Sequence, residues 1–207
     1  MKYQVIIADP PWSFNDKLAK MKAKTKRSAA SQYGVMTVGD ITNLDVASLA
    51  DPAGCVLALW VPGSFMAQGL EVAKAWGFTL KQNFIWVKTK KRKLKAGELA
   101  HPANHLAFGM GRLFRQTHET ALICTSGKSV YPLLEDHSQR SVCFWPNMGH
   151  SQKPPLLHFS LEEMFPEADR LELFARRDFP NWTCVGLECP STQGEDVRDS
   201  ISRLRAM

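Results

Sequence analysis

The sequence predicts a single α/β domain, because short apolar strand-like runs alternate along the chain with helix-like segments. The chain has 207 residues, of which 44% are apolar and 22% charged, so it can bury one substantial core and is unlike a disordered or collagen-like chain. No repeat or linker divides it. We therefore expect one domain over residues 1–190, followed by a polar, exposed tail over residues 191–207 with room for one helical turn.

The first half of the chain contains strand-like runs that end in turn-forming residues. Residues 3–8 are rich in β-branched and apolar side chains and stop at Asp9-Pro10-Pro11, where proline cannot donate to a strand ladder. Thr37 and Asp40 have the spacing of a capping box and indicate a helix over residues 41–49. The pattern further predicts strands over residues 55–61 and 78–87 and a helix over residues 64–76 that Gly77 closes.

The second half of the chain continues the alternation of strands and helices. Pro154 and Pro155 suit the first turn of a helix that runs through residues 161–165, because a first-turn residue needs no backbone N–H donor. Strands are predicted over residues 119–124, 142–145, 170–175 and 183–187. Strands that alternate with helices in this way build a sheet on which the helices pack.

Neither a membrane span nor a metal site is predicted. The longest apolar run, residues 55–62, has eight residues, whereas a membrane-spanning helix needs roughly 18 or more. The opening residues lack a secretory signal, so we expect a cytoplasmic protein. The five cysteines form no CxxC pair and have no histidine at zinc-ligand spacing, and we therefore expect reduced, buried thiols and no bound metal.

Basic residues are concentrated in two runs. The chain has 26 Lys and Arg against 20 Asp and Glu, and each of the segments 17–27 and 88–95 holds six of these basic residues. Such runs can bind nucleic-acid phosphates, although a solvated loop surface is the alternative for either run alone. The candidate nucleic-acid-binding residues are Lys22, Lys24, Lys26, Arg27, Lys88, Lys90, Lys91, Arg92, Lys93 and Lys95.

Asp9, Pro10, Pro11 and Trp12 are the candidate catalytic residues. They follow a predicted buried strand, and open α/β sheets bind ligands at the carboxyl ends of their strands. An aromatic amine is a poor nucleophile, because its lone pair is delocalised into the ring. The Asp9 carboxylate and the Pro10 carbonyl can each accept one hydrogen of an NH2 group, which directs the lone pair at an electrophile, while Trp12 stacks on the base. Alternatively, the motif only ends the strand and Trp12 packs in the core.

Several further motifs accompany this one in a fixed order. They are ADPPW at 8–12, Tyr33-Gly34, LWVP at 59–62, IWVKT at 85–89, His118-Glu119, HSQKP at 150–154 and ELFARRDFPNW at 172–182. Together they resemble the adenine-N6-methyltransferase family that includes the messenger-RNA adenosine methyltransferase and its bacterial and phage DNA relatives. The resemblance covers nearly the whole chain, and it implies a Rossmann-like S-adenosylmethionine-dependent methyltransferase fold with permuted motif order in a single domain.

The resemblance also implies a set of cofactor-binding residues. Lys153 corresponds to a family lysine that lies beside the methionine portion of S-adenosylmethionine and pairs with a glutamate, here Glu119. Arg176 corresponds to an arginine at the ribose. Where the family often has Gly-Asn before Glu or Gln, this chain has Gly186-Leu187-Glu188, and Leu187 cannot hydrogen-bond. The candidate cofactor-binding residues are Asp9, Glu119, Lys153, Arg176, Asn181 and Glu188.

DNA is the favoured substrate, because short single-domain members of the family resemble its prokaryotic and phage DNA type. An RNA adenosine methyltransferase is one alternative, and a catalytically silent nucleic-acid-binding subunit is another. A duplex substrate would have to extrude the target adenine. A homodimer is possible. Gly109-Met110-Gly111 begins like a dinucleotide fingerprint, but the third glycine is missing and we assign it no function.

Overall fold

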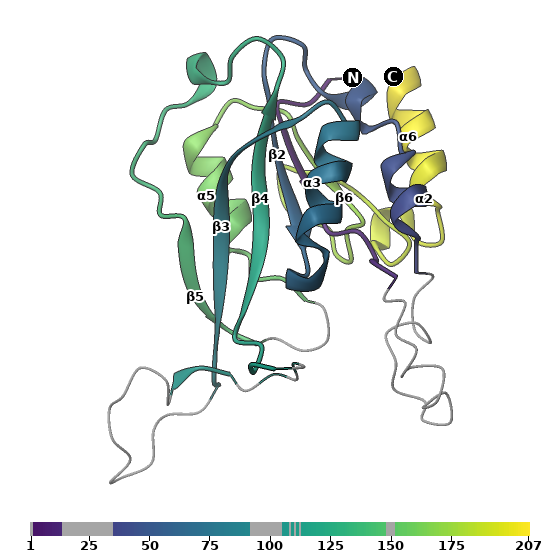
Figure 1. The fold of residues 1–207 in the computed structure, drawn as a ribbon. Helices are drawn as coiled ribbons and strands as arrows, with labels where there is room; N and C mark the ends of the chain where they lie inside the picture. The colour runs from purple at the N-terminus through teal and green to yellow at the C-terminus, as the bar shows by residue number, and fades with distance from the viewer. Residues whose placement is uncertain are drawn as a thin grey trace, which may run out of the picture.

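One mixed sheet organises the molecule (Figure 1). The computed structural model describes residues 2–13, 35–91, 105–107, 109, 111, 113–147 and 152–207. The strands are β1 (Val5–Ala8), β2 (Cys55–Val61), β3 (Thr79–Thr89), β4 (His118–Ser126), β5 (Val142–Pro146), β6 (Arg170–Leu173) and β7 (Thr183–Val185). They form a seven-stranded sheet in the order β5-β3-β4-β2-β1-β6-β7. Among these strands, β4 alone runs against the others.

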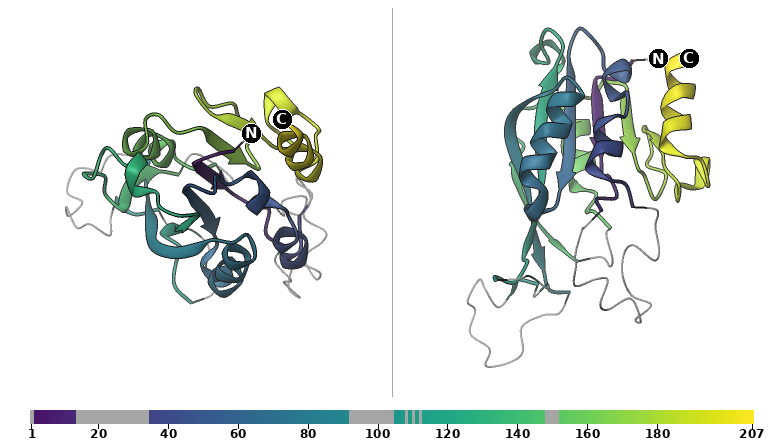
Figure 2. Two further views of the ribbon diagram at one scale, coloured as in Figure 1. Left: turned by 90° about the horizontal axis from the view of Figure 1, so that it is seen from above. Right: turned by 45° about the vertical axis from the view of Figure 1, so that its right-hand side comes forward.

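Helices cover both faces of the sheet, as the view from above shows (Figure 2). One face packs against α2 (Val38–Thr42), a 3-10 turn (Val46–Leu49), α3 (Met66–Ala75) and α6 (Val197–Ala206). The other face packs against α5 (Leu156–Met164). Further 3-10 turns lie at Gly63–Phe65, Tyr131–Leu133 and Pro190–Thr192. Because the central strands β1 and β2 are covered on both faces, every one of their residues is buried.

The predicted alternation of strands and helices is confirmed, with shifts of a few residues at the boundaries. The predicted capping box is present, because the Thr37 hydroxyl accepts the Asp40 backbone N–H at 3.1 Å and the Asp40 carboxylate accepts the Thr37 N–H at 3.0 Å. The single helix expected over residues 41–49 was wrong. Asn43 caps α2 after Thr42, and the chain continues as a separate 3-10 turn.

The exposed tail expected over residues 191–207 is instead mostly a helix that packs on the sheet. Its N-cap is Asp196, whose side chain accepts the backbone N–H of Arg198 at 2.8 Å. Val197, Ile201 and Leu204 lie on one face and join the core that contains α2 and α3. The abundance of polar residues concealed these three apolar side chains, although their spacing of four and three residues is typical of an amphipathic helix.

Replacing Leu204 with alanine should lower the free energy of unfolding by about 2–4 kcal/mol, because the side chain is 1% exposed and its loss leaves a cavity under α6. Ser202 lies on the exposed face of the same helix, and Ser202→Ala should change stability by less than about 0.5 kcal/mol. Urea unfolding of both variants measures the difference. Equal stability of the two variants would show that α6 does not contribute to the core.

The cysteines agree with the expectation of buried thiols. All five cysteines are buried and free. Burial raises the pKa of Cys55 to about 12 and that of Cys124 to about 11, so these thiols stay protonated at neutral pH. Across the described ranges, no helix has the length and apolar character needed to cross a membrane. The same residues contain no group of three or more side chains arranged to hold a metal ion.

Candidate active site

Strands β1, β3 and β6 end at one edge of the sheet, which is the lower edge in Figure 1. Five ionisable side chains come from segments at this edge. Asp9 follows the last residue of β1, and Lys88 lies near the end of β3. Since β4 runs in the opposite direction, its second residue, Glu119, lies at this same edge, opposite Trp86 of β3. Arg176 comes from the segment after β6, and Lys153 comes from the segment before α5.

Lys153 joins the two carboxylates of this cluster. Its Nζ lies 2.7 Å from Oδ2 of Asp9 and 3.3 Å from Oε2 of Glu119, and 5.5 Å from the centre of the Trp60 ring. The Lys153–Glu119 contact is the one that the resemblance implied. The shorter contact with Asp9 was not predicted, because a separation of 144 residues gives no sequence signal. The cluster therefore links the predicted catalytic carboxylate directly to the predicted cofactor-binding lysine.

Burial and charge compete at each of these three groups. Burial raises the pKa of Asp9 above its ordinary value, and Lys153 and Arg176 only partly counter this effect. Burial disfavours charge on Lys153, but the two neighbouring carboxylates outweigh it and raise the pKa of the amine. At Glu119, burial is outweighed by Lys153 and Lys88, so its pKa is lowered. Lys153 and Glu119 are thus held charged. Of the two carboxylates, Asp9 has the raised pKa and Glu119 the lowered one.

Lys88 is placed differently from the exposed basic residues with which the sequence analysis grouped it. We expected it to bind phosphates, but its side chain is 15% exposed and forms an ion pair with Glu119. Its Nζ also lies 4.9 Å from the centre of the Trp86 ring. The physical reason is strand geometry, because Lys88 is two residues beyond Trp86 on β3 and Trp86 pairs with Glu119 across to β4. Trp60 and Trp86 were missed as site residues, although both lie within motifs already noted.

The remaining basic candidates divide into two groups. Lys90 is half-buried and Lys91 is exposed, and both follow the end of β3 at the edge that carries the cluster. Their binding of phosphates stays a prediction. Seven candidates lie outside the described residues, namely Lys22, Lys24, Lys26, Arg27, Arg92, Lys93 and Lys95.

Replacing Lys88 with methionine should lower the free energy of unfolding by roughly 1–3 kcal/mol at neutral pH, because Glu119 loses one of its two cationic partners. Because the pKa of Glu119 is lowered, its charged form stabilises the fold at pH values above its ordinary pKa of 4.5. This contribution to stability is lost as the pH falls through the lowered pKa. The difference between wild type and variant should therefore shrink below about pH 4.5, as urea unfolding at several pH values would show. Lys91→Met, which changes an exposed neighbour, is the matched control; an equal effect there would contradict the assignment.

Trp12 is part of the core rather than an open stacking surface. It is 5% exposed, its indole N–H donates to the Trp60 carbonyl at 3.1 Å, and its ring centre lies 5.7 Å from that of Phe65. Its backbone N–H donates to the Pro10 carbonyl at 2.9 Å, and the Met36 N–H donates to the Pro11 carbonyl at 2.9 Å. The expectation that Trp12 stacks on a base does not fit this burial. Trp12 instead fixes the backbone that follows Asp9.

The two cofactor candidates that follow β6 and β7, Arg176 and Glu188, differ in their distance from the cluster and in their exposure. Arg176 is close enough to Asp9 to lower its pKa. Glu188 is exposed just beyond β7, next to Leu187, which is also exposed. Gly186 allows the two strand ends to approach, because a Cβ there would lie 2.3 Å from the Ala175 carbonyl oxygen. Arg176 therefore belongs to the cluster, and Glu188 lies at the same edge of the sheet.

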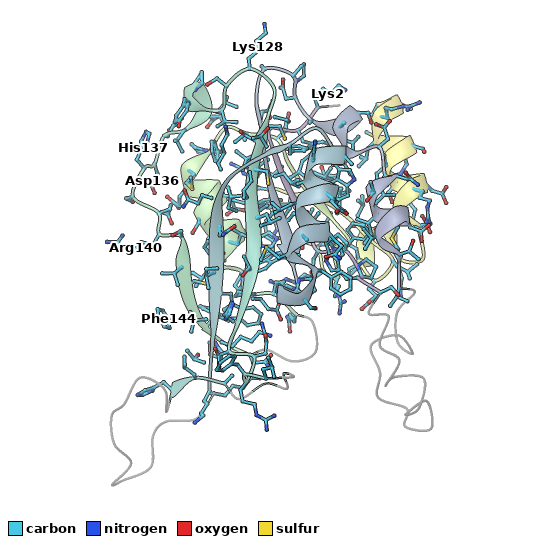
Figure 3. All side chains as sticks on the ribbon, viewed as in Figure 1. Lys2, Lys128, Asp136, His137, Arg140 and Phe144 are labelled. Carbon is cyan, nitrogen blue, oxygen red and sulfur yellow. The ribbon has the colours of Figure 1, made fainter. Side chains whose placement is uncertain are left out.

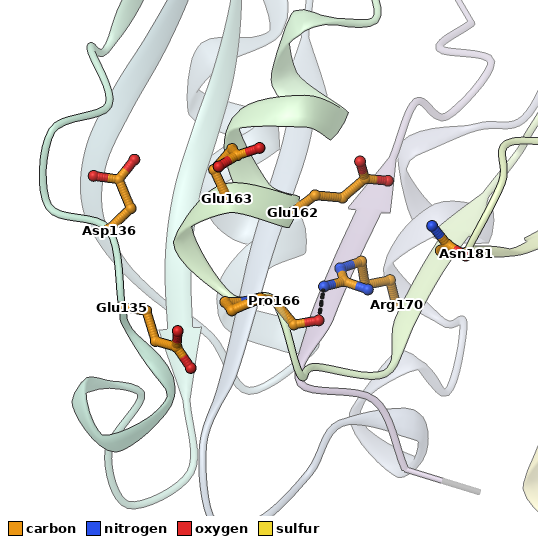
Figure 4. Close-up of a pocket in the computed structure, with 7 residues that line it drawn as sticks. All are labelled: Glu135, Asp136, Glu162, Glu163, Pro166, Arg170 and Asn181. Carbon is orange, nitrogen blue, oxygen red and sulfur yellow. Dashed lines mark hydrogen bonds between the residues drawn. The ribbon is translucent and has the colours of Figure 1, made fainter.

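Asn181 lies elsewhere. It precedes β7 and lines a pocket of about 680 Å³ with Arg170, the first residue of β6, so it is at the opposite edge from Asp9 (Figure 4). The other lining residues are Glu135, Asp136, Glu162, Glu163 and Pro166, whose carbonyl accepts a hydrogen bond from Arg170. The structure does not bring Asn181 to the other cofactor candidates, because β7 separates it from their edge.

Comparisons with known proteins agree with this architecture. A model of the MT-A70 family matches residues 3–188. The type II methyltransferase M.MunI of Mycoplasma sp is 31% identical over 222 residues, which cover 94% of this chain and 83% of the relative. An MT-A70-like N(6)-adenosine-methyltransferase of Arabidopsis thaliana is 29% identical over 84% of this chain, and the human N(6)-adenosine-methyltransferase catalytic subunit METTL3 is 26% identical over 89%. The chain spans only 22% and 28% of these two proteins.

The sheet, its two helical layers and the cluster at its edge define a Rossmann-like, S-adenosylmethionine-dependent methyltransferase fold, as predicted. The family match extends from β1 to the end of the sheet. The chain belongs to the MT-A70 family.

The residues at the edge of the sheet fit the cofactor of this family. S-adenosylmethionine carries an ammonium, a carboxylate and ribose hydroxyls. Lys153 and Arg176 can pair with the carboxylate, and Glu119 can accept hydrogen bonds from the ammonium. A partly buried lysine with carboxylates at 2.7 and 3.3 Å suits a zwitterionic amino-acid group better than a neutral ligand.

Proposed function

We propose that this protein transfers a methyl group from S-adenosylmethionine to the N6 amino group of adenine in DNA. The observation that carries the proposal is the position of Asp9, a partly buried carboxylate just after the end of a central strand and 2.7 Å from Lys153. Two further observations support this function: the chain belongs to the MT-A70 family, and its relatives include adenosine methyltransferases.

The catalytic work of the chain is to orient the amino group. Asp9 accepts one N6 hydrogen and the Pro10 carbonyl accepts the other, which directs the nitrogen lone pair at the methyl group that S-adenosylmethionine supplies. The Pro10 carbonyl already accepts the Trp12 N–H, but a carbonyl oxygen has two lone pairs and can accept a second hydrogen. The methylated ammonium is strongly acidic, so its proton needs no dedicated base. Lys153 orients Asp9 through their hydrogen bond.

We prefer DNA to RNA because the match covers different shares of the relatives' lengths. The type II methyltransferase among the relatives is matched over 83% of its length, whereas the two adenosine methyltransferases are matched over 22% and 28% of theirs. The shared region is therefore most of the type II methyltransferase but a minor part of the two adenosine methyltransferases. RNA adenosine methylation is the second candidate, because those relatives also match nearly the whole of the present chain.

Methyl transfer to matched DNA and RNA oligonucleotides tests the proposal. Purified protein is incubated with each oligonucleotide and with cofactor that carries a labelled methyl group. We expect label in N6-methyladenine of DNA, and label confined to RNA would overturn the proposal. A calorimetric titration that shows no binding of S-adenosylmethionine would favour the silent subunit. Sedimentation of the same sample tests the possible homodimer.

A further inference from the structure

The connection between β3 and β4 extends the sheet beyond its catalytic edge. Leu106 pairs with Thr89, the Ala107 N–H donates to the Lys88 carbonyl at 2.7 Å, and the Lys88 N–H donates to the Thr117 carbonyl at 2.8 Å. Residues 105–107 and Thr117 therefore both pair with the end of β3 on the side that faces β4, while β5 pairs with the other side. The segment between them begins and ends next to the ion pair of Lys88 with Glu119.

Two glycines shape the turn within this connection. The Gly109 N–H donates to the Gln116 carbonyl at 3.3 Å, which closes the turn. A Cβ at Gly109 would lie 2.6 Å from that carbonyl oxygen, and a Cβ at Gly111 would lie 2.0 Å from the Phe114 carbonyl oxygen. Both contacts are too short for any other residue, so the turn needs glycine at both positions. Gly109 and Gly111, to which we assigned no function, thus let the backbone approach Gln116 and Phe114 closely.

This turn holds two large apolar side chains in solvent. Leu113 is 93% exposed and Phe114 is 88% exposed. Single exposed apolar residues are common on protein surfaces. Two adjacent large ones, Leu113 and Phe114, form a small exposed apolar patch. Lys90, Lys91 and Arg115 lie along the same connection and give its surroundings positive charge.

We propose that Leu113 and Phe114 form a wedge that enters the base stack of duplex DNA at the place from which the target adenine is extruded. This inference rests on the proposed function and deepens it. Apolar side chains inserted between base steps unstack them, and an enzyme that modifies a base in a duplex has to extrude it. Phe114 is five residues from Glu119, a span of at most about 17 Å, which is comparable to the major-groove width of about 12 Å.

The charge of the surrounding residues favours DNA over a protein as the partner that binds Leu113 and Phe114. Lys90, Lys91 and Arg115 attract a polyanion, and the phosphates would bring the duplex against the catalytic edge. A second copy of this chain would carry the same basic groups and a net charge of +6, so the two copies would repel each other here. The basic side chains complement the charged phosphates of DNA, and the apolar wedge complements its stacked bases.

The test compares Phe114→Ala and Phe114→Trp with a control, Tyr131→Ala. Tyr131 is a 75% exposed aromatic residue three positions after Lys128, which lies at the upper edge of the molecule (Figure 3). Each protein receives a duplex whose adenine the wild type methylates, and the same strand unpaired. Phe114→Ala should lose about tenfold or more in kcat/KM on the duplex and change by less than about threefold on the single strand. Phe114→Trp should keep duplex activity, and Tyr131→Ala should match the wild type.

A fluorescent base analogue at the target position reports extrusion directly. 2-Aminopurine brightens when it leaves the stack, and we expect wild type and Tyr131→Ala to produce this signal in the duplex and Phe114→Ala to lose it. Equal activity of Phe114→Ala on both substrates, or an equal loss on both, overturns the wedge while methylation of DNA still stands. Dissociation of a dimer by Phe114→Ala also overturns it. If the wild type methylates neither DNA, the proposed function fails first.

Discussion

Replacing Asp9 with asparagine is expected to reduce the rate of methyl transfer by about 10²–10³-fold or more, a loss typical of removing one preorganised electrostatic contact at a reacting group. Asparagine keeps the shape of the side chain, but its neutral amide is a weaker hydrogen-bond acceptor than a carboxylate. The N6 lone pair would then be poorly directed. Single-turnover transfer of a labelled methyl group to DNA measures this loss.

The same variant should still bind the cofactor within a few-fold of the wild-type affinity. Lys153 retains Glu119 at 3.3 Å when the charge of Asp9 is removed, so the cluster keeps an ion pair. Calorimetry with S-adenosylmethionine checks this. Asp169→Asn is the control, since it removes an exposed carboxylate immediately before β6, at the opposite edge of the sheet. Unchanged turnover in Asp9→Asn would refute the assigned role.

The pH dependence of transfer should also report Asp9. The carboxylate accepts a hydrogen only when it is charged, and burial raises its pKa above the ordinary value of 3.8. Activity should therefore decline on the acid side at a higher pH than an exposed aspartate would give. Because Lys153 lowers the pKa of Asp9, Lys153→Met should move this decline to still higher pH in cofactor-saturated reactions. A decline that stays in place would contradict the coupling.

Trp12→Ala should have the largest effect on stability and lower the free energy of unfolding by about 3–5 kcal/mol. The indole is buried and packs on Phe65, and its N–H donates to the Trp60 carbonyl. Truncation leaves a large cavity and a carbonyl without this donor. Trp12→Phe keeps most of the packing and should lose much less. Urea unfolding of the two variants gives both values.

A stacking role for Trp12 makes the opposite prediction. If the indole stacked on the substrate base, Trp12→Ala would leave the free energy of unfolding nearly unchanged and would weaken substrate binding alone. Measuring KM for DNA beside the unfolding curve separates the two roles. We expect the stability loss to dominate, and we expect any loss of activity to follow the movement of the Pro10 carbonyl.

The order of strands and helices could be predicted from sequence because it depends on local signals. A buried parallel strand is an unbroken apolar run, and Pro and Gly mark its ends. Asp9, Glu119 and Lys153 could be identified because they lie in motifs that the family shares. Their meeting at one edge follows from the sheet topology, with β1 ending there and β4 beginning there.

Features that depend on pairing between distant segments could not be predicted. The role of Lys88 follows from the register of β3 on β4, which no single segment encodes. A run of lysines predicts a solvated surface, and only the position of Glu119 across the strands shows that one of them is internal. Asn181 was proposed because it lies in a shared motif, but it has a positive φ of 63° in the turn before β7, whereas Gly186 and Glu188 follow that strand.

The reversed direction of β4 has a consequence for how this fold can change. The chain leaves β3 and re-enters β4 at one edge, so residues 90–117 form a single excursion whose ends stay fixed. Lengthening or shortening that excursion leaves the pairing of all seven strands intact. We therefore expect changes in the length of this connection to alter the surroundings of the Asp9–Lys153–Glu119 cluster at only a small cost in loop-closure entropy.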